Sequence, residues 1–264
     1  MSRWLERWRS LAGGPRLALA VEADALAWTA PDDAGPALGW PPGTTPDWEA
    51  LCARLVAPAG ARRGAALAVS VADHWCRWWC VEPSTGAARL ADLQAAAAAR
   101  FEARFGGSAG DWAIDADWRA GAGFVAAGLP RALLLALRQL AAERGWRLTR
   151  VAPASVAAYA LHRHAAGTAW RCAAAPTHAI AWYAPAGRPA ALMQAWYDAP
   201  PGEAELAAQL RRLALVEGIE APRTAAVADV SLRAPLAWPP ALRDAARHGR
   251  PWPLPAPVAA MEPA

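Results

Sequence analysis

The spacing of apolar and polar residues predicts alternating strands and helices that occur in the same order twice. Short apolar runs in the first part predict strands, and apolar residues three and four apart predict one helix. The predicted elements of this part are strands at 16–21, 26–30, 37–40 and 65–71 and a helix at 46–56. After Gly167 the predicted elements are strands at 169–174, 177–183, 190–197 and 223–230 and a helix at 203–216. Both parts have the order β-β-β-α-β, so the chain carries an internal repeat of topology.

The first part also carries a hairpin-and-helix insertion at about 73–128. The predicted elements of the insertion are strands at 74–81, 111–118 and 123–127 and a helix at 87–105, which Gly106 and Gly107 end. Pro130 begins the next helix, a strand follows at 146–151, and Pro153 begins a helix that continues through His164. The pattern therefore predicts a mixed α/β protein in which helices connect the strands.

These elements divide the chain into four regions. We expect a leader at 1–15, a first lobe at 16–167, a truncated second lobe at 168–232 and a Pro-rich C-terminal tail at 233–264. One short helix at 241–247 interrupts the tail. In the leader, Trp4 and Trp8 lie opposite arginines on an amphipathic helix, a pattern that suits a membrane surface, a partner protein or packing onto the domain.

The composition excludes several functions. The sequence contains no Lys, so all 27 basic residues are Arg, and a P-loop lysine or a Schiff-base lysine is impossible. The net charge of +4 is spread along the chain and does not form the stripe that nucleic-acid binding needs. Four irregularly spaced Cys and no signal peptide suit a reducing compartment. Since no apolar run approaches the ~20 residues of a transmembrane helix, we expect a soluble cytoplasmic protein.

Three segments of the first lobe carry a resemblance to a known family. They are residues 69–71 at the entry to the insertion, the helical pattern at 90–106, and the helix at 129–140 with the strand at 146–153. Together with the doubled β-β-β-α-β order, they resemble the cytoplasmic actin-like proteins of type IV pilus assembly (PilM) and the matching cytoplasmic domain of type II secretion protein L (GspL). The resemblance covers about 16–230 and implies an actin-like ATPase (ribonuclease-H-like) fold.

The resemblance also implies where ATP would bind. Members that bind ATP cradle its phosphates and Mg²⁺ with two hairpin turns of an Asp-x-Gly type, because backbone N–H groups must approach the phosphates closely. The first turn would fall at 21–26, where Glu22 and Asp24 supply acids but no Gly follows. The second would fall at 177–183, which has neither Asp nor Gly. We therefore expect no cofactor and no catalytic residues, with Glu22 and Asp24 as the remaining candidates for ATP and Mg²⁺.

By resemblance, the chain would be a non-catalytic scaffold peripheral to the inner membrane of a type IV pilus or type II secretion platform. It would bind the cytoplasmic segment of a membrane partner beside its first lobe. The alternative is a Mg²⁺-dependent actin-like ATPase or ribonuclease-H-like enzyme.

Two groups of residues have side chains that bind metals. If 74–81 is a strand, His74, Cys76 and Cys80 point to one face and could bind zinc, although Cys is also an ordinary small core residue. Asp111, Asp115 and Asp117 would share another strand face and could hold Mg²⁺ for the alternative enzyme, or form a solvated face opposite buried Trp.

Tryptophans concentrate in the insertion. Trp75, Trp78 and Trp79 lie in one predicted strand, and Trp112 and Trp118 lie in another. Trp is favoured both in cores and at interface hot spots. The first three residues are the predicted partner-binding site.

Overall fold

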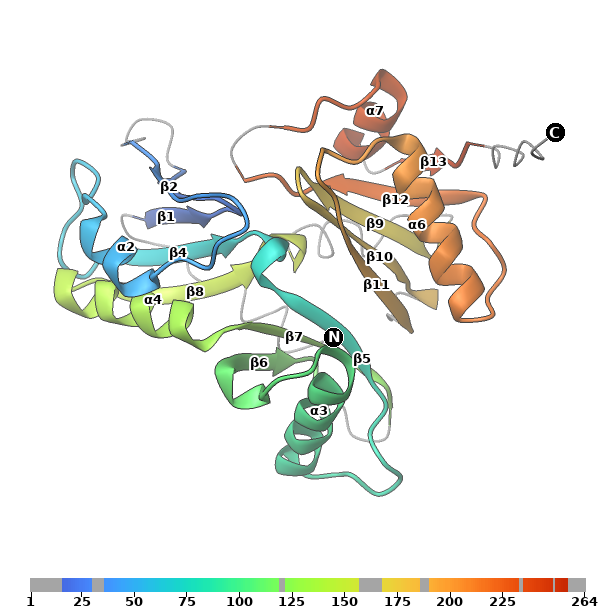
Figure 1. Cartoon of the computed structure of the whole chain (residues 1–264), viewed down its shortest axis with the longest axis horizontal. Helices are drawn as coiled ribbons and strands as arrows, with labels where there is room; N and C mark the ends of the chain where they lie inside the picture. Colours follow the sequence, from blue (N-terminus) through green and yellow to red (C-terminus); the bar gives the residue numbers. More distant parts are fainter. Residues whose placement is uncertain are drawn as a thin grey trace. The chain divides into compact units, whose positions relative to one another are not determined.

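The computed structural model describes residues 16–29, 36–118, 122–156, 168–185, 190–232, 235–248 and 250–255. The leader and most of the predicted helix at 153–164 lie outside these residues. The chain divides into two compact units, one of Met1–Ala160 with Val230–Pro235 and one of Leu161–Asp229 with Leu236–Ala264. Each unit contains one five-stranded sheet (Figure 1).

The sheet of the first unit confirms the predicted strand order. Its strands are β1 (Arg16–Val21), β2 (Ala25–Trp28), β3 (Leu38–Gly39), β4 (Ala66–Val71) and β8 (Arg147–Pro153). They are arranged β3-β2-β1-β4-β8, with β1 antiparallel to β2 and parallel to β4, and with β4 parallel to β8. The central strands alternate apolar residues towards the core, as the fully buried Leu67, Val69 and Val71 of β4 show.

Two helices pack together on this sheet. Helix α2 (Trp48–Arg54) begins at Asp47, whose carboxylate accepts a hydrogen bond from the N–H of Ala50 at 3.0 Å. Helix α4 (Arg131–Arg144) buries Leu133, Leu137 and Leu140 and packs along β8 and α2. The left-handed Gly145, with a φ of 66°, ends α4 and turns the chain into β8.

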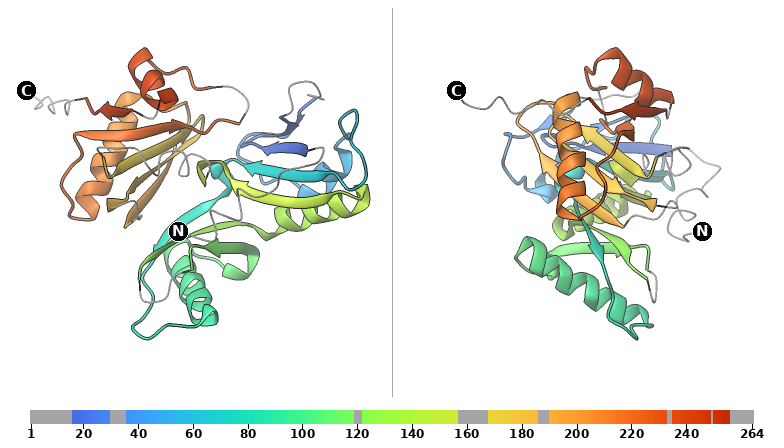
Figure 2. Two further views of the ribbon diagram at one scale, coloured as in Figure 1. Left: turned by 180° about the vertical axis from the view of Figure 1, so that it is seen from behind. Right: turned by 90° about the vertical axis from the view of Figure 1, so that its right-hand side faces the viewer.

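The insertion forms a three-stranded antiparallel sheet and a helix (Figure 2). Its elements are η1 (Asp73–Trp75), β5 (Arg77–Val81), α3 (Leu90–Phe105), η2 (Ala109–Asp111), β6 (Trp112–Ala116) and β7 (Phe124–Pro130). The strand order is β5-β7-β6, and Trp79, Leu93 and Phe101 lie at the centre of the core between sheet and helix. The strand predicted at 74–81 is wrong at its start, because residues 73–75 form a 3-10 turn.

The second unit repeats the strand order of the first. Its strands are β9 (Trp170–Ala175), β10 (His178–Tyr183), β11 (Ala191–Trp196), β12 (Thr224–Asp229) and β13 (Pro251–Pro253). They are arranged β11-β10-β9-β12-β13, and α6 (Glu203–Val216) packs its buried Leu206, Leu210 and Leu213 on one face. The predicted doubled topology is thus confirmed. The two sheets differ in the direction of their last strand, since β13 is antiparallel to β12.

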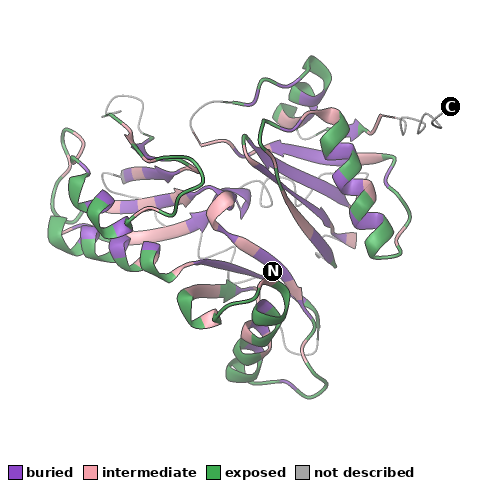
Figure 3. Ribbon diagram, viewed as in Figure 1, coloured by how far each residue is buried: buried purple, intermediate pink, exposed green. Residues whose placement is uncertain are grey.

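The segment after residue 232 differs from the expected tail. It contains α7 (Pro240–His248) and β13, and it contributes Trp238, Leu242 and Trp252 to the core of the second unit. Figure 3 shows buried positions on both α7 and β13. Proline-rich sequence is compatible with an edge strand, because the missing N–H can face outward while the residue between two prolines faces inward. The second lobe therefore extends beyond the expected boundary at 232.

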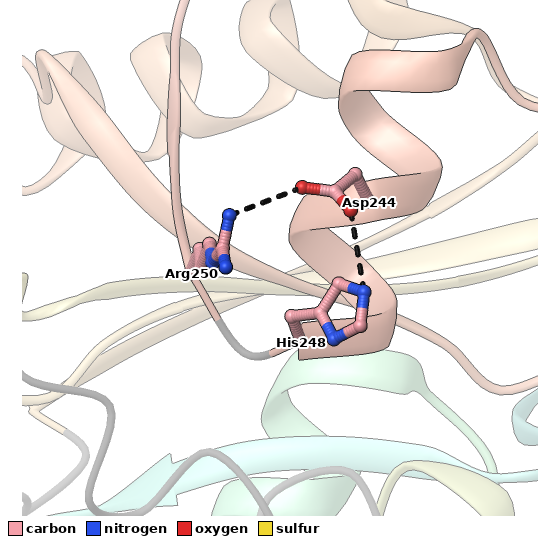
Figure 4. A network of polar contacts seen from close by, with 3 residues as sticks. All are labelled: Asp244, His248 and Arg250. Atoms are coloured by element: carbon pink, nitrogen blue, oxygen red, sulfur yellow. Dashed lines mark ion pairs between the residues drawn. The ribbon is translucent and has the colours of Figure 1, made fainter.

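Ion pairs join the end of α7 to the chain that enters β13. The carboxylate of Asp244 lies 3.3 Å from Nε2 of His248 and 3.7 Å from Nη1 of Arg250 (Figure 4). All three side chains are at least half exposed, so these pairs contribute little free energy and mainly orient the turn. Burial of Trp238, Leu242 and Trp252 holds this segment in place.

We expect Trp252→Ala to destabilise the second unit. Its side chain is only 2% exposed, and truncating a buried Trp costs about 3–5 kcal/mol. The measurement is urea unfolding followed by circular dichroism. Pro253→Ala, at the exposed neighbouring position, is the control and should leave the midpoint unchanged. Equal midpoints for Trp252→Ala and the unmodified chain would contradict the assignment of β13 to the core.

Candidate functional site

The carboxyl ends of three parallel strands meet at one edge of the first sheet. Val21 of β1 lies opposite Val71 of β4, and Val71 lies opposite Pro153 of β8. Ligands of open α/β sheets bind at such an edge, so the residues that follow these strands are the first candidates for a site. We call Glu22, Asp73, Trp75, Trp78 and Ser155 the strand-end cluster.

Asp73 is the centre of the strand-end cluster. Its side chain is fully buried, and Oδ1 accepts hydrogen bonds from Nε1 of Trp78 at 2.8 Å and from the hydroxyl of Ser155 at 2.6 Å. Oδ2 accepts a third bond from the N–H of Ser155 at 2.8 Å. A buried carboxylate is tolerated only when hydrogen bonds replace its hydration, and here both oxygens have donors. Asp73 therefore ties the end of β4 to β5 and to the helical residues 154–156.

The turn between β1 and β2 is closed by hydrogen bonds to its backbone. The N–H of Glu22 donates to the carbonyl of Ala25 at 2.7 Å, and Nε1 of Trp75 donates to the carbonyl of Glu22 at 2.5 Å. The N–H of Trp40 donates to the carbonyl of Asp24 at 3.0 Å. Glu22 is half-buried and Asp24 is exposed. The turn is thus packed against two tryptophans and contains no glycine.

The described residues do not match the nucleotide site that the resemblance implies. Phosphate binding at a hairpin turn needs backbone N–H groups that face the ligand, but the N–H of Glu22 is bonded within its own turn. The corresponding turn of the second sheet connects β9 to β10 through Pro176 and Thr177, and Pro176 has no N–H. Neither turn combines a glycine with a carboxylate, so these residues do not fit a Mg²⁺–nucleotide.

Three indoles form a second feature at the same edge. Trp40, Trp48 and Trp75 contact one another with ring centroids 5.1–6.2 Å apart, two of the three pairs edge to face. Trp48 is buried, whereas Trp40 and Trp75 are half-buried and so reach the surface. We call these residues the tryptophan triad. The sequence predicted a role for Trp75 but gave no sign that Trp40 and Trp48 would join it.

The other two predicted partner-binding residues are core residues. Trp79 is completely buried, donates from Nε1 to the carbonyl of Ala97 at 3.2 Å and packs on Phe101. Trp78 is 8% exposed and bonds Asp73. The prediction of a surface formed by Trp75, Trp78 and Trp79 is therefore wrong for two of its residues. They are consecutive in β5, so Trp79 lies in the core beneath α3, whereas the indole of Trp78 reaches Asp73.

The structure separates the predicted zinc ligands. His74 lies in η1 and Cys80 lies in β5, so the three residues do not share one strand face. Cys76 is fully buried between them, and burial followed by the charge of Asp73 raises the pKa of its thiol well above the usual range. Metal binding requires a thiolate, which this environment disfavours.

The predicted magnesium ligands are also not on one strand face. Asp111 belongs to η2, Asp117 follows the end of β6, and the exposed Asp115 accepts a hydrogen bond from Nε1 of Trp118 at 3.1 Å. Throughout the part of the chain that the structure describes, no three His, Cys, Asp or Glu residues are grouped so that they could hold a metal ion. No described helix is both long and apolar enough to cross a bilayer.

Comparison with known proteins finds similarity in structure alone. No protein-family model matches the chain, and no curated protein sequence is significantly similar to it. A Bacteroides thetaiotaomicron protein with an actin-like ATPase fold and unknown function is similar over 81% of this chain and 80% of its own, with a TM-score of 0.50 and 8% identity. This likeness confirms the predicted actin-like fold.

Two further structures belong to the assemblies that the sequence resemblance named. One is the cytoplasmic domain of EpsL, an inner membrane component of the Vibrio cholerae type II secretion system. It has a TM-score of 0.45 and 15% identity, and the match covers 85% of each chain. The other is a PilM–PilN type IV pilus biogenesis complex, with a TM-score of 0.45 and 14% identity over 68% of this chain and 60% of that chain.

We expect Asp73→Ala to destabilise the first unit strongly. It leaves three buried donors, the Trp78 indole and the N–H and hydroxyl of Ser155, without their acceptor, and an unsatisfied buried donor costs about 1–3 kcal/mol. The measurement is the free energy of unfolding from urea titration. Asp24→Ala removes an exposed carboxylate near the same edge and should change stability by less than about 0.5 kcal/mol. A similar loss in both variants would show that the Asp73 hydrogen bonds are not structural.

Proposed function

We propose that this chain is a non-catalytic scaffold on the cytoplasmic side of a type IV pilus or type II secretion inner-membrane platform. There it would bind the cytoplasmic segment of a membrane partner. The choice of platform comes from the sequence resemblance of residues 69–71, 90–106, 129–140 and 146–153. The observation that carries the non-catalytic role is the hydrogen bond from Trp75 to the carbonyl of Glu22, which packs an indole against the turn where a nucleotide's phosphates would lie.

Two acidic residues at this edge of the first sheet support the same conclusion. Mg²⁺ requires oxygen ligands in octahedral geometry, and a carboxylate that binds it must have lone pairs directed at the ion. Asp73 already accepts three hydrogen bonds and is fully buried. Asp24 is exposed, but its turn lacks the glycine that lets a phosphate approach the backbone. The edge is therefore suited to structural support, and its function is proposed to be protein binding.

The tryptophan triad is the proposed contact for the partner. Trp40 and Trp75 reach the surface, and the buried Trp48 supports them from behind. A half-buried aromatic pair on a rigid base resembles the hot spots of protein interfaces, where little side-chain entropy is lost on binding. We propose that an apolar or aromatic side chain of the partner's segment packs on these two indoles.

The test is co-purification of the tagged chain from solubilised membranes of its own host. We expect enrichment of a small single-span inner-membrane protein of a pilus or secretion platform. Trp75→Ala should lower its recovery, whereas Trp196→Ala, which truncates a 46% exposed indole in the second unit, should not. Unfolding midpoints of both variants show whether they remain folded. Recovery of no such membrane protein, or equal recovery with both variants, would overturn the proposal.

The alternative of a Mg²⁺-dependent enzyme rests on Glu22 and Asp24, which lie at the carboxyl end of β1. We expect Mg²⁺–ATP to leave the thermal midpoint unchanged. A nucleotide present at a hundred times its dissociation constant would add about 2.7 kcal/mol and shift the midpoint by several degrees. A shift that Glu22→Ala or Asp24→Ala abolishes would favour the enzyme. Asp198→Ala, which removes an exposed acid of the second unit, is the control and should retain any such shift.

A further inference from the structure

An exposed apolar loop joins α2 to β4 and is flanked by arginines. Residues 56–61 are Val, Ala, Pro, Ala, Gly and Ala, with Arg54 before them and Arg62 and Arg63 after them. The side chain of Val56 is 74% exposed, among the highest values for a large apolar residue in the described chain. We call residues 55–65 the Val56 loop. Neither the fold nor the proposed scaffold role accounts for an exposed apolar residue at this position.

The Val56 loop is ordered although it is exposed. The carbonyl of Val56 accepts a hydrogen bond from Nε1 of Trp28 at 2.8 Å, and the N–H of Ala61 donates to the carbonyl of Pro58 at 3.1 Å. Gly60 and Gly64 have φ angles of 80° and 81°, and a Cβ at either position would meet no atom within 4 Å. The backbone is thus held in tight turns that stand in open space. Val56 is presented to the surroundings on a fixed support.

Arginines from a second segment lie beside the loop. Nη2 of Arg144 donates to the carbonyl of Leu55 at 3.1 Å, and the N–H of Gly64 donates to the carbonyl of Gly145 at 2.7 Å. The N–H of Arg147 donates to the carbonyl of Ala65 at 2.8 Å, which places the start of β8 beside the end of the loop. The exposed arginines that this arrangement gathers are Arg54, Arg62, Arg63, Arg144 and Arg147.

Acidic residues are scarce around these arginines. The sequence has no Asp or Glu between Ala50 and Ala72, and none between Arg144 and Tyr197. Glu143 directly precedes Arg144, and its carboxylate accepts a hydrogen bond from Gln139 on α4. The charge at this end of the sheet is therefore strongly positive, although the net charge of the whole chain is only +4.

We propose that the Val56 loop and its five arginines form a docking surface for an anionic phospholipid bilayer. Val56 enters the boundary between headgroups and acyl chains, and the guanidinium groups bind lipid phosphates, which they can do with two hydrogen bonds each. An acidic protein segment would form ion pairs with the arginines, but it would offer no apolar contact to the uncharged tip of the loop. The proposal does not rest on the scaffold function, because it concerns the chemistry of this loop alone.

The first test is sedimentation of the full chain with vesicles. We expect binding to vesicles of phosphatidylglycerol and phosphatidylethanolamine, loss of binding at 1 M salt, where the screening length falls to about 3 Å, and none to phosphatidylcholine alone. Arg62→Gln with Arg63→Gln should weaken binding about 25-fold, since each arginine near an anionic surface contributes about fivefold. The matched control is Arg212→Gln with Arg223→Gln, which removes the same charge from exposed positions of the second unit and should bind as the unmodified chain does.

The second test separates the apolar contact from charge. Val56→Ser, which leaves the charge unchanged, should reduce binding, whereas Leu215→Ser, at a position 83% exposed in the second unit, should not. The arginine variants and the Val56 variant, each with its control, are also measured in a chain that carries Trp4→Glu and Trp8→Glu. These two changes remove binding through the amphipathic leader from the comparison. We expect the Val56 loop variants to lower binding in this background as well. Unfolding midpoints establish that each variant is folded.

Several results would overturn the proposal. These are failure of the unmodified chain to bind anionic vesicles at low salt, equal binding by the Val56 loop variants and their controls, and binding to polyglutamate in place of vesicles. The last result would assign the surface to an acidic protein. None of them bears on co-purification of a membrane protein through Trp75, so the two proposals fail independently.

Discussion

A buried carboxylate holds the carboxyl ends of the first sheet together. Asp73 lies two residues beyond the end of β4, and its hydrogen bonds reach both the following strand and the segment after β8. The position at which the insertion leaves the sheet is therefore fixed by one side chain. The same bonds explain why this acid is poorly suited to metal chemistry, since its oxygens are already used to connect the backbone.

The two ends of the parallel strands in the first unit have opposite chemistry. Acids and indoles lie at the carboxyl ends, whereas arginines surround an apolar loop at the amino ends. A six-residue strand such as β4 spans roughly 20 Å, so the two proposed surfaces are separated by the length of the sheet. One surface can therefore contact lipid while the other contacts a protein, without competition between them.

The sequence predicts the fold better than it predicts the site. Periodic leucines such as Leu133, Leu137 and Leu140 locate a helix because burial and helical spacing agree, and the doubled strand order follows from the apolar runs. The hydrogen bonds of the Asp73 carboxylate escaped prediction because one partner, Ser155, lies 82 residues away in the sequence. The same holds for the tryptophan triad, whose members come from three separate segments.

Burial could not be predicted for aromatic residues in short segments. Trp79 and Trp75 lie four residues apart, yet one is in the core of the insertion and the other reaches the surface. The proline-rich segment gave a similar error, because composition suggested a tail while the position of Trp252 between two prolines allowed an edge strand. In both cases the outcome depends on what covers the strand, which local sequence does not contain.

The two prolines of β13 also limit how the second sheet can grow. A strand from another molecule that approached this edge would need backbone N–H donors, and Pro251 and Pro253 supply none. The edge that completes the sheet is thus unable to template further pairing. A protein gathered in many copies at one assembly would be protected at this edge from fibre-like self-association, without any charged residue in the strand itself.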